Sequence, residues 1–290
     1  MNLAIGTANF GKEYGLNKKK LSQKDLNKIR NLLLKSKIKI FDTSQLYQDS
    51  EQKISSLKLK NLNIITKLTI KQKNHKTLKE LLNRKIFNSL NNLGGVKNIY
   101  GVLIHDSKDL INKYGKKIIE QLKYLKKRGI IQNVGISIYD PKELDNIWKF
   151  WKPDIVQAPL NILDQRIIET GWLKKLKKNK VKFFSRSIFL QGLLINKNKN
   201  KNIILNNNQK KKLKQFYDWC KIEKVSRVEA CMQYVKQYNS VDFIIIGFDN
   251  FKQLKQLIEI FNKKTIEVPD KFKTKNLDLI DPRKWKIKKK

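Results

Sequence analysis

Cysteine and histidine are both scarce in this chain, which limits the chemistry available to it. The 290 residues include two cysteines, Cys220 and Cys231, and two histidines, His75 and His105. Two cysteines cannot form a framework of disulfide bridges, and no close group of Cys and His has the spacing of a zinc site. We therefore expect no metal centre and no disulfide scaffold, and we predict a reducing, cytoplasmic setting.

Long apolar runs are also missing. No run approaches the ~18–20 apolar residues that a membrane-spanning helix needs. The N-terminal residues Met1–Gly6 lack the charged and long apolar segments of a signal peptide. Only 12 glycines and 5 prolines occur, whereas 40% of the residues are hydrophobic. The composition therefore excludes a disordered or collagen-like chain, suffices for one large core, and predicts no membrane partner.

Acidic residues are few: 25 of them stand against 64 basic residues, for a net charge of +39. Such an excess can indicate binding to nucleic acid or to an anionic membrane. The basic residues are nearly all lysine, however, and they are spread from Lys12 to Lys290, without a patch of interleaved aromatic residues. Lysine, asparagine and isoleucine share A/T-rich codons, so a biased genome accounts for this surface. We predict no specific nucleic-acid partner.

Short apolar runs alternate with longer amphipathic stretches along the whole chain. The apolar runs are Leu3–Ile5, Ile38–Phe41, Leu62–Thr66, Ile99–Ile104, Ile130–Ile136, Asp154–Ala158, Val181–Phe184 and Val241–Ile246. Helices are predicted near residues 22–36, 50–58, 75–92, 114–127, 140–149, 168–178, 207–237 and 250–262. Several runs are continuously apolar, as is typical of strands buried on both faces. Eight strand–helix pairs predict a single-domain α/β protein, a closed (β/α)8 TIM barrel.

A doubly wound parallel sheet is the alternative fold. It favours a Gly-x-Gly-x-x-Gly turn after the first strand, and the segment Gly6–Gly11 does not have that spacing. Within the barrel interpretation, Ser22 and Asp25 form a weak capping box, and Asp140-Pro141 opens a helix. Residues 196–212 are predicted to form a polar loop. We divide the chain into a barrel over 1–268 and a basic C-terminal tail over 269–290.

Ionisable residues follow three consecutive predicted strands. Asp42 ends the second strand, Lys67 ends the third, and His105 follows the fourth, while Tyr47 lies five residues beyond the aspartate. Active sites of such barrels lie at the carboxyl ends of the strands, so these four side chains are expected at one rim. A phenol with a pKa near ~10 is a poor acid at neutral pH. A neighbouring ammonium lowers that pKa, and a carboxylate holds the ammonium in place. The combination predicts proton donation to a carbonyl that receives a hydride.

Several further motifs follow one another along the chain. Residues 42–51 read Asp-Thr-Ser-Gln-Leu-Tyr-Gln-Asp-Ser-Glu, and residues 129–137 read Gly-Ile-Ile-Gln-Asn-Val-Gly-Ile-Ser. Gly6–Gly11, Asp154–Gln157 with Asn161, and Gln191–Leu194 complete the series. Together they resemble the aldo-keto reductases over nearly the whole chain. The resemblance implies a catalytic tetrad of Asp42, Tyr47, Lys67 and His105.

The resemblance also implies a nicotinamide cofactor, NADPH or NADH. Ser137 and Gln157 would hold the carboxamide, and Arg186 takes the position of an aromatic ring that stacks on the nicotinamide in many members. Gln253 stands where many members have an arginine for the adenosine 2′-phosphate, so strict preference for NADPH is in doubt. The full set of cofactor-binding candidates is Gly6, Thr7, Asp42, Ser137, Gln157, Arg186, Ser187, Leu190, Gln191, Gly192, Leu193, Gly247 and Gln253.

These features predict an NAD(P)-dependent oxidoreductase that reduces an aldehyde or ketone, with Tyr47 as proton donor. Its partner would be a small carbonyl substrate, and the chain is expected to be a monomer or a weak oligomer. The alternative keeps the same barrel as a cofactor-binding, redox-sensing regulatory subunit with little turnover.

Overall fold

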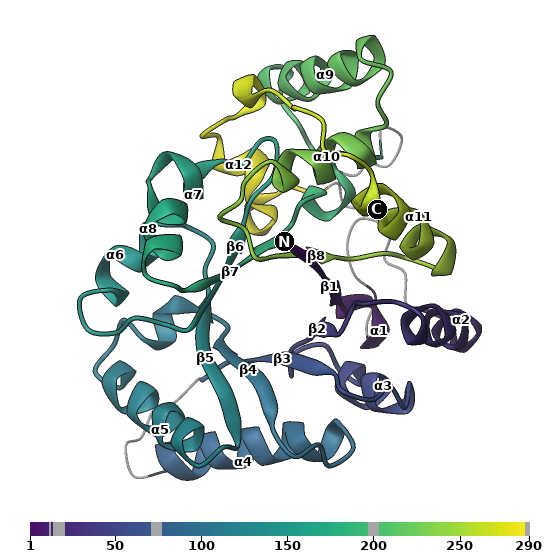
Figure 1. Cartoon of the computed structure of the whole chain (residues 1–290). Helices are drawn as coiled ribbons and strands as arrows, with labels where there is room; N and C mark the ends of the chain where they lie inside the picture. Colours follow the sequence, from purple (N-terminus) through teal and green to yellow (C-terminus); the bar gives the residue numbers. More distant parts are fainter. Residues whose placement is uncertain (12, 14–20, 71–76, 197–202, 288–290) are drawn as a thin grey trace.

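The structure is a computed structural model that describes residues 1–11, 13, 21–70, 77–196 and 203–287. Eight parallel strands follow one another around a closed barrel, and the last strand pairs with the first. Figure 1 shows the helices arranged outside these strands. The strands are β1 Asn2–Gly6, β2 Ile40–Asp42, β3 Asn63–Leu68, β4 Ile99–Ile104, β5 Ile131–Ser137, β6 Ile155–Pro159, β7 Lys182–Arg186 and β8 Phe243–Ile246. The predicted (β/α)8 TIM barrel is therefore confirmed, and closure excludes the doubly wound sheet.

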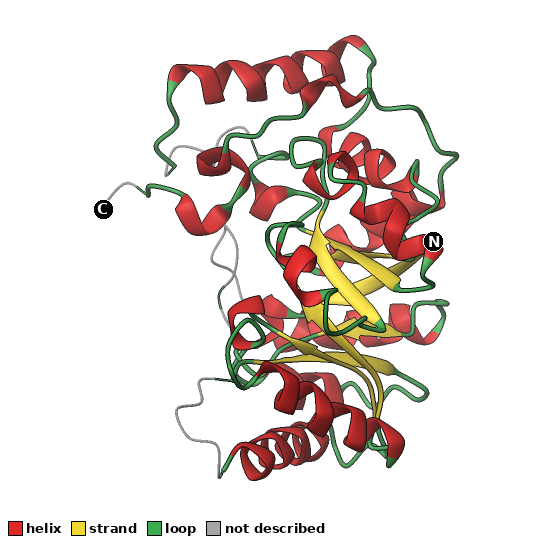
Figure 2. Cartoon of the chain, turned by 90° about the vertical axis from the view of Figure 1, so that its left-hand side faces the viewer, coloured by secondary structure: helices red, strands yellow, loops and turns green. Residues whose placement is uncertain are grey.

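Burial on both faces explains the apolar character of the strands. One apolar cluster fills the interior of the barrel, and a larger one lies between the strands and the surrounding helices. Figure 2 shows the strands with helices around them. The interior cluster contains Ala4, Ile40, Ile65, Leu103, Ile155, Phe184 and Ile245. Alternate residues of each strand point to opposite faces, so a strand of this kind needs apolar residues at nearly every position.

The helices follow the strands in the predicted order. They are α1 Ala8–Gly11, α2 Gln23–Leu34, α3 Ser50–Ser56, α4 Leu78–Asn92, α5 Gly115–Lys127, α6 Glu143–Ile147, α7 Arg166–Glu169, α8 Trp172–Lys178, α9 Asn207–Ile222, α10 Arg227–Lys236 and α11 Phe251–Asn262. The predicted cap of α2 is confirmed, since the Ser22 hydroxyl accepts from the Asp25 N–H at 3.1 Å. The start of the helix predicted at 75–92, with His75, lies outside the described residues.

Two predictions about the region after β7 are wrong. Residues 197–202 of the predicted loop 196–212 lie outside the described residues, and the prediction extends too far because the Asn206 side chain caps α9 by accepting from the Gln209 N–H at 2.9 Å. Asn207 and the lysines after it are therefore helical. The helix predicted over 207–237 is broken into α9 and α10, because Lys224 takes a left-handed φ of 52° and Ser226 caps a new helix. Likewise Gly171, with a φ of 75°, separates α7 from α8.

The C-terminal segment packs against the barrel. It contains the short helices η4 Asp270–Phe272, α12 Leu277–Ile280 and η5 Pro282–Lys284, and it buries Phe272, Leu279 and Ile280. The Thr274 N–H donates to the Leu163 carbonyl at 3.0 Å, which ties the segment to the loop that follows β6. The boundary between residues 268 and 269 stays a prediction. None of the described helices combines the length and apolar character required to cross a membrane.

Candidate active site

A cavity of about 320 Å³ opens at the carboxyl ends of the strands. We call it the central cavity. Its lining comes from the ends of seven of the eight strands and from the loops and helices that follow them: Gly6, Thr7, Ala8, Asn9, Asp42, Tyr47, Lys67, His105, Ser137, Tyr139, Gln157, Arg186, Ser187, Ile188, Phe189, Gln191, Gly192, Ile195, Asn196, Val228, Ile245, Gly247, Phe248, Asp249, Gln253, Gln256 and Leu257. All four tetrad candidates are among them. Cavities of this size and position commonly bind small molecules in barrel enzymes.

Lys67 and Asp42 form a buried ion pair at the base of the cavity. The Lys67 Nζ donates to Asp42 Oδ1 at 2.8 Å and to Oδ2 at 2.7 Å, and also to the Thr43 carbonyl at 2.9 Å. The two side chains are only 2% and 7% exposed. A buried ammonium needs a partner of this kind, because its desolvation is otherwise costly. The neighbouring strands β2 and β3 hold both groups in place.

Tyr47 lies on the loop after β2, and a close approach by α1 fixes that loop. A Cβ atom on Gly11 would overlap the main-chain oxygen of Tyr47 and would lie 2.8 Å from the Ser50 nitrogen. Only glycine allows this contact. The Tyr47 N–H donates to the Ser44 carbonyl at 2.9 Å, and the Ser50 N–H donates to the Tyr47 carbonyl at 3.1 Å. The phenol therefore enters the cavity from a loop that is held at both sides.

His105 and Lys67 both lie beside the Tyr47 ring. The Tyr47 and His105 rings meet edge to face, with centroids 6.4 Å apart and planes at 88°. The Lys67 Nζ lies 5.4 Å from the Tyr47 ring centroid. The Ser44 hydroxyl lies 3.2 Å from His105 Nδ1 and holds one side of the imidazole. The structure thus brings the four predicted side chains together around one point.

The pKa of Tyr47 is shifted in the direction opposite to our expectation. Burial raises the pKa of the phenol, and the negative charge of Asp42 raises it further, while Arg186 acts to lower it. The prediction that Lys67 lowers this pKa is wrong for this geometry. Lys67 is paired with both oxygens of Asp42, and burial and the Asp42 charge together outweigh the cations near the phenol. Tyr47 consequently keeps its proton at neutral pH.

Most of the predicted cofactor-binding residues line the central cavity. They are Gly6, Thr7, Asp42, Ser137, Gln157, Arg186, Ser187, Gln191, Gly192, Gly247 and Gln253. Leu190 and Leu193 do not line it, because their side chains are fully buried in the apolar core. They shape the loop after β7 from behind, where Leu190 and Gln191 have left-handed φ values of 47° and 52°.

Gln157 and Ser137 supply a test of whether a nicotinamide ring fits. Both are buried and line the cavity, Ser137 at the end of β5 and Gln157 within β6. The Gln157 Nε2 donates to Asp42 Oδ1 at 2.7 Å, while Gln157 Oε1 is buried without a hydrogen-bond partner within the described residues. A buried acceptor of this kind is costly unless a ligand donates to it. A primary carboxamide has the donor that Oε1 lacks, so these residues fit a nicotinamide.

Arg186 extends from the end of β7 to the wall of the cavity. Its Nη1 donates to the Ser187 hydroxyl at 3.1 Å and its Nη2 to the Ile138 carbonyl at 2.9 Å. Its guanidinium carbon lies 4.1 Å from the centroid of the Tyr139 ring. The planar group is therefore fixed by three contacts and can present a flat surface to a ring in the cavity.

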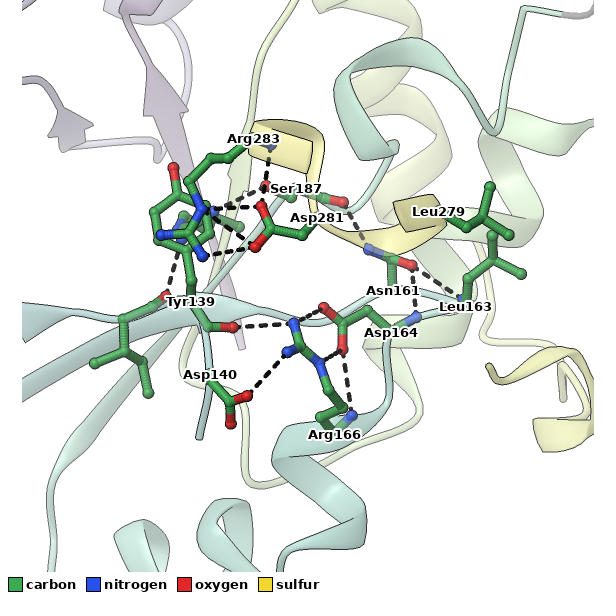
Figure 3. Close-up of polar contacts among 12 residues, drawn as sticks. Tyr139, Asp140, Asn161, Leu163, Asp164, Arg166, Ser187, Leu279, Asp281 and Arg283 are labelled. Atoms are coloured by element: carbon green, nitrogen blue, oxygen red, sulfur yellow. Dashed lines mark hydrogen bonds and ion pairs between the residues drawn. The ribbon is translucent and has the colours of Figure 1, made fainter. Parts of the chain in front are cut away.

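Sequence reasoning missed several residues of this region. Tyr139 lines the cavity, and the Arg283 guanidinium carbon lies 3.5 Å from its ring centroid. Arg283 is in turn paired with Asp281 at 2.6 Å, as Figure 3 shows. Asp249 also lines the cavity, from the loop between β8 and α11. Tyr139 and Asp249 could have been found from the sequence, because both follow a predicted strand. No local sequence pattern indicates that the C-terminal segment with Arg283 folds back onto the barrel.

Glu51 supports the site from behind. This buried carboxylate accepts from the Thr66 hydroxyl at 2.7 Å, from the Ser89 hydroxyl at 2.8 Å and from the Asn92 amide at 3.1 Å. It thereby ties α3 to β3 and α4 beside Lys67.

No group of three or more His, Cys, Asp or Glu that could hold a metal ion occurs among the described residues.

The fold and the site together define a (β/α)8 barrel with an ionisable cluster at its carboxyl rim. A sequence profile of the aldo/keto reductase family matches residues 2–274, so the chain belongs to the aldo-keto reductase family, as its motifs predicted. The family carries out nicotinamide-dependent oxidoreduction on small carbonyl compounds. A search of curated protein sequences gives no significant match.

Solved structures of this family share the fold. Aldo-keto reductase AKR11C1 from Bacillus halodurans in its holo form is 20% identical, with a TM-score of 0.75 over 92% of this chain and 88% of that one. The glycerol dehydrogenase AKR11B4 from Gluconobacter oxydans is 19% identical, with a TM-score of 0.71 over 97% and 92%. At such low identity the similarity concerns the fold alone.

Proposed function

We propose that this chain reduces an aldehyde or ketone with NADPH or NADH, and that Tyr47 donates the proton. The observation that carries the proposal is the juxtaposition of Tyr47, His105 and the buried Lys67–Asp42 pair around one cavity. The unpartnered Gln157 Oε1 lies in the same cavity and suits a carboxamide. When bound, the reduced nicotinamide supplies a hydride to the carbonyl carbon.

The remaining chemistry belongs to the chain's own side chains. Tyr47 holds its proton because burial raises its pKa, and it gives that proton to the carbonyl oxygen as negative charge develops there. His105, held by Ser44, orients the carbonyl toward the phenol. Lys67 stabilises the phenolate that remains, and Asp42 keeps the ammonium in place. Gln157, Ser137 and Arg186 orient the nicotinamide ring.

A regulatory subunit on the same barrel is the second candidate, and the burial of the Tyr47 phenol near the Asp42 carboxylate, which raises its pKa, favours it. A general acid works best when its pKa lies near the working pH. A phenol with a raised pKa is a weaker acid, and such a site would bind the cofactor and turn over slowly. Measurements with a substrate are needed to distinguish the reductase from the regulatory subunit, because a bound carbonyl changes the polarity around the Tyr47 phenol and therefore its pKa.

The distinguishing experiment combines cofactor binding with turnover. The purified chain is incubated with NADH or NADPH and a panel of aldehydes, ketones and sugars, and the loss of reduced-nicotinamide absorbance is followed. Turnover that depends on one of these carbonyl classes supports the reductase. Tight cofactor binding with negligible turnover on all of them supports the regulatory subunit. If the chain shows no cofactor binding and no turnover, both candidate functions are contradicted.

The setting proposed for this activity is cytoplasmic. Cys220 and Cys231 are both free and buried, as is typical of proteins from a reducing compartment. A monomer or weak oligomer remains our prediction for the assembly.

A further inference from the structure

One basic side chain of the central cavity, Arg186, pairs with no carboxylate of the described residues. Apart from His105, the carboxylates and cations that these residues contribute to the lining are Asp42, Lys67, Arg186 and Asp249. Asp42 and Lys67 pair with each other, and Asp249 stands on the loop between β8 and α11. The described part of the chain includes every Asp and Glu of the sequence, and the Arg186 guanidinium donates only to neutral groups there. The cavity therefore holds a cation whose charge is not matched by a contacting carboxylate.

Arg186 lies beside Gln157 on the cavity side of the neighbouring strand. β6 and β7 pair so that Gln157 is opposite Phe184, and two residues further on Pro159 is opposite Arg186. Ile155 and Phe184 belong to the interior cluster, and the residue two positions beyond each of them shares its face of the strand. Gln157 and Arg186 therefore both face the inside of the barrel, with Arg186 nearer the rim. A nicotinamide whose carboxamide meets Gln157 Oε1 would lie within electrostatic range of the guanidinium.

Neutral contacts hold the Arg186 side chain in place. Its Nη1 donates to the Ser187 hydroxyl at 3.1 Å, and its Nη2 donates to the Ile138 carbonyl at 2.9 Å. The Tyr139 ring covers one face of the guanidinium, with 4.1 Å between the guanidinium carbon and the ring centroid. None of these partners is a carboxylate. They fix the position of the cation without cancelling its charge.

Arg283 holds the Tyr139 ring from the other side. Its guanidinium carbon lies 3.5 Å from the ring centroid, and two guanidiniums this close to one centroid would overlap if they shared a face. The ring is therefore sandwiched between Arg186 and Arg283. Arg283 pairs with Asp281 at 2.6 Å (Figure 3). The C-terminal segment thus supports Arg186 through Tyr139 while its own cation at this point is matched by a carboxylate.

The charge of a nicotinamide ring depends on its redox state. The oxidised ring carries a positive charge and the reduced ring is neutral, whereas the phosphates and the adenosine are the same in both forms. A fixed cation beside the ring therefore repels the oxidised form and leaves the reduced form unaffected. An aromatic side chain in the same place would act in the opposite sense, because the face of an aromatic ring attracts a cation.

We propose, resting on the function proposed above, that Arg186 makes the cavity selective for the reduced form of the nicotinamide cofactor. The chain takes up NADH or NADPH from a mixture with the oxidised forms, and it releases the oxidised form readily. This selectivity suits both candidate functions. A reductase is loaded with the form that it consumes, and a regulatory subunit responds to the redox state of the cofactor pool.

Calorimetric titration of the full chain tests the selectivity without a substrate. The dissociation constants of NADH and NAD⁺, and of NADPH and NADP⁺, are measured. We expect the reduced form of each pair to bind at least ~10-fold more tightly than the oxidised form. The net charge of +39 also attracts the more negative reduced form at long range. The titrations are therefore carried out at raised salt, which screens this long-range attraction far more than a contact inside the cavity.

Two variants and a matched control assign the selectivity to Arg186. Arg186→Gln removes the charge and keeps a planar donor, so the ratio of the oxidised to the reduced dissociation constant should fall ~10-fold. Arg186→Lys keeps the charge and should retain most of the ratio. Arg128→Gln makes the same charge change at the exposed C-cap of α5, which leads into β5 at the end of the barrel opposite the cavity. This control should leave the ratio unchanged.

Each contrary result has a distinct meaning. Equal binding of both forms by the unaltered chain would overturn the selectivity, and this comparison does not depend on the folding of any variant. An Arg186→Gln protein that keeps the ratio of the unaltered chain would overturn the role of Arg186. Both results leave the nicotinamide site standing, whereas a failure of all four cofactor forms to bind would overturn the proposed function as well.

Discussion

The ammonium of Lys67 lies within 2.8 Å of both carboxylate oxygens of Asp42, and the pair is almost completely buried. The same carboxylate accepts from the Gln157 amide at 2.7 Å. Asp42 therefore joins the two halves of the site: the half that would handle the proton and the half that would hold the nicotinamide. Removing one member of this group leaves another buried polar group without its partner.

Lys67→Met should destabilise the fold through this connection. The substitution preserves much of the side-chain volume but leaves Asp42 charged and buried, which costs about 3–5 kcal/mol when one partner of a buried pair is removed. The double variant Lys67→Met/Asp42→Asn removes the stranded charge as well, so it should be less destabilised than Lys67→Met alone. Urea unfolding of the unaltered chain, Lys67→Met, Asp42→Asn and the double variant measures the difference. A double variant whose loss equals the sum of the single losses would show that the pair does not couple.

The C-terminal segment should give the fold an acid-sensitive contact. Burial alone would raise the pKa of Asp281, but its hydrogen bonds with Arg283 hold the pKa below the ordinary value. A carboxylate with a lowered pKa stabilises the fold above its unfolded pKa near ~3.9, and that stabilisation is lost as the pH falls through the folded pKa. Asp281→Asn should cost about 1.5–3 kcal/mol at neutral pH, as expected for a charged hydrogen bond.

The pH dependence separates this contact from general acid unfolding. The difference in unfolding free energy between the unaltered chain and Asp281→Asn should shrink as the pH falls below about 4. Asp278→Asn on the neighbouring α12 is the matched control and should show a smaller difference at neutral pH, since the Asp281–Arg283 pair remains. A difference that is independent of pH would contradict the assigned role of the Asp281 charge.

Binding to nucleic acid should reflect charge alone. If the excess of lysine is compositional, the chain should bind duplex DNA weakly and without sequence preference, and the affinity should fall steeply as salt rises. Fluorescence anisotropy with several unrelated duplexes across a salt series provides the measurement. A complex with one sequence that persists at physiological salt would show a nucleic-acid function that the site does not explain.

The barrel could be predicted because its signals are local. A strand buried on both faces requires a run such as Ile99–Ile104, and the carboxyl end of each strand faces one rim, so Asp42, Lys67 and His105 could be placed together. The break before α10 was missed because neither glycine nor proline marks it; the left-handed Lys224 and the Ser226 cap make it instead.

Other features depend on contacts that no local pattern reports. Arg283 reaches Tyr139 only because the C-terminal segment folds back onto the rim. The Tyr47 pKa is raised first by the burial of the phenol and then by the Asp42 charge. The Arg283–Tyr139 contact and the Tyr47 pKa shift both depend on how segments that are separated in the sequence pack together. A local sequence pattern carries no information about that packing.

Tyr47→Phe is the most direct test of the proposed mechanism. The change removes one hydroxyl and keeps the ring against His105, so the unfolding free energy and the cofactor dissociation constant should remain nearly unchanged. The rate of reduction of the best carbonyl substrate should fall by ~10²–10⁴, as is typical of the loss of a general acid. Steady-state kcat measured beside cofactor binding gives the answer. A large loss of kcat with intact binding is the result that we predict, and a Tyr47→Phe protein that retains the kcat of the unaltered chain would contradict proton donation by Tyr47.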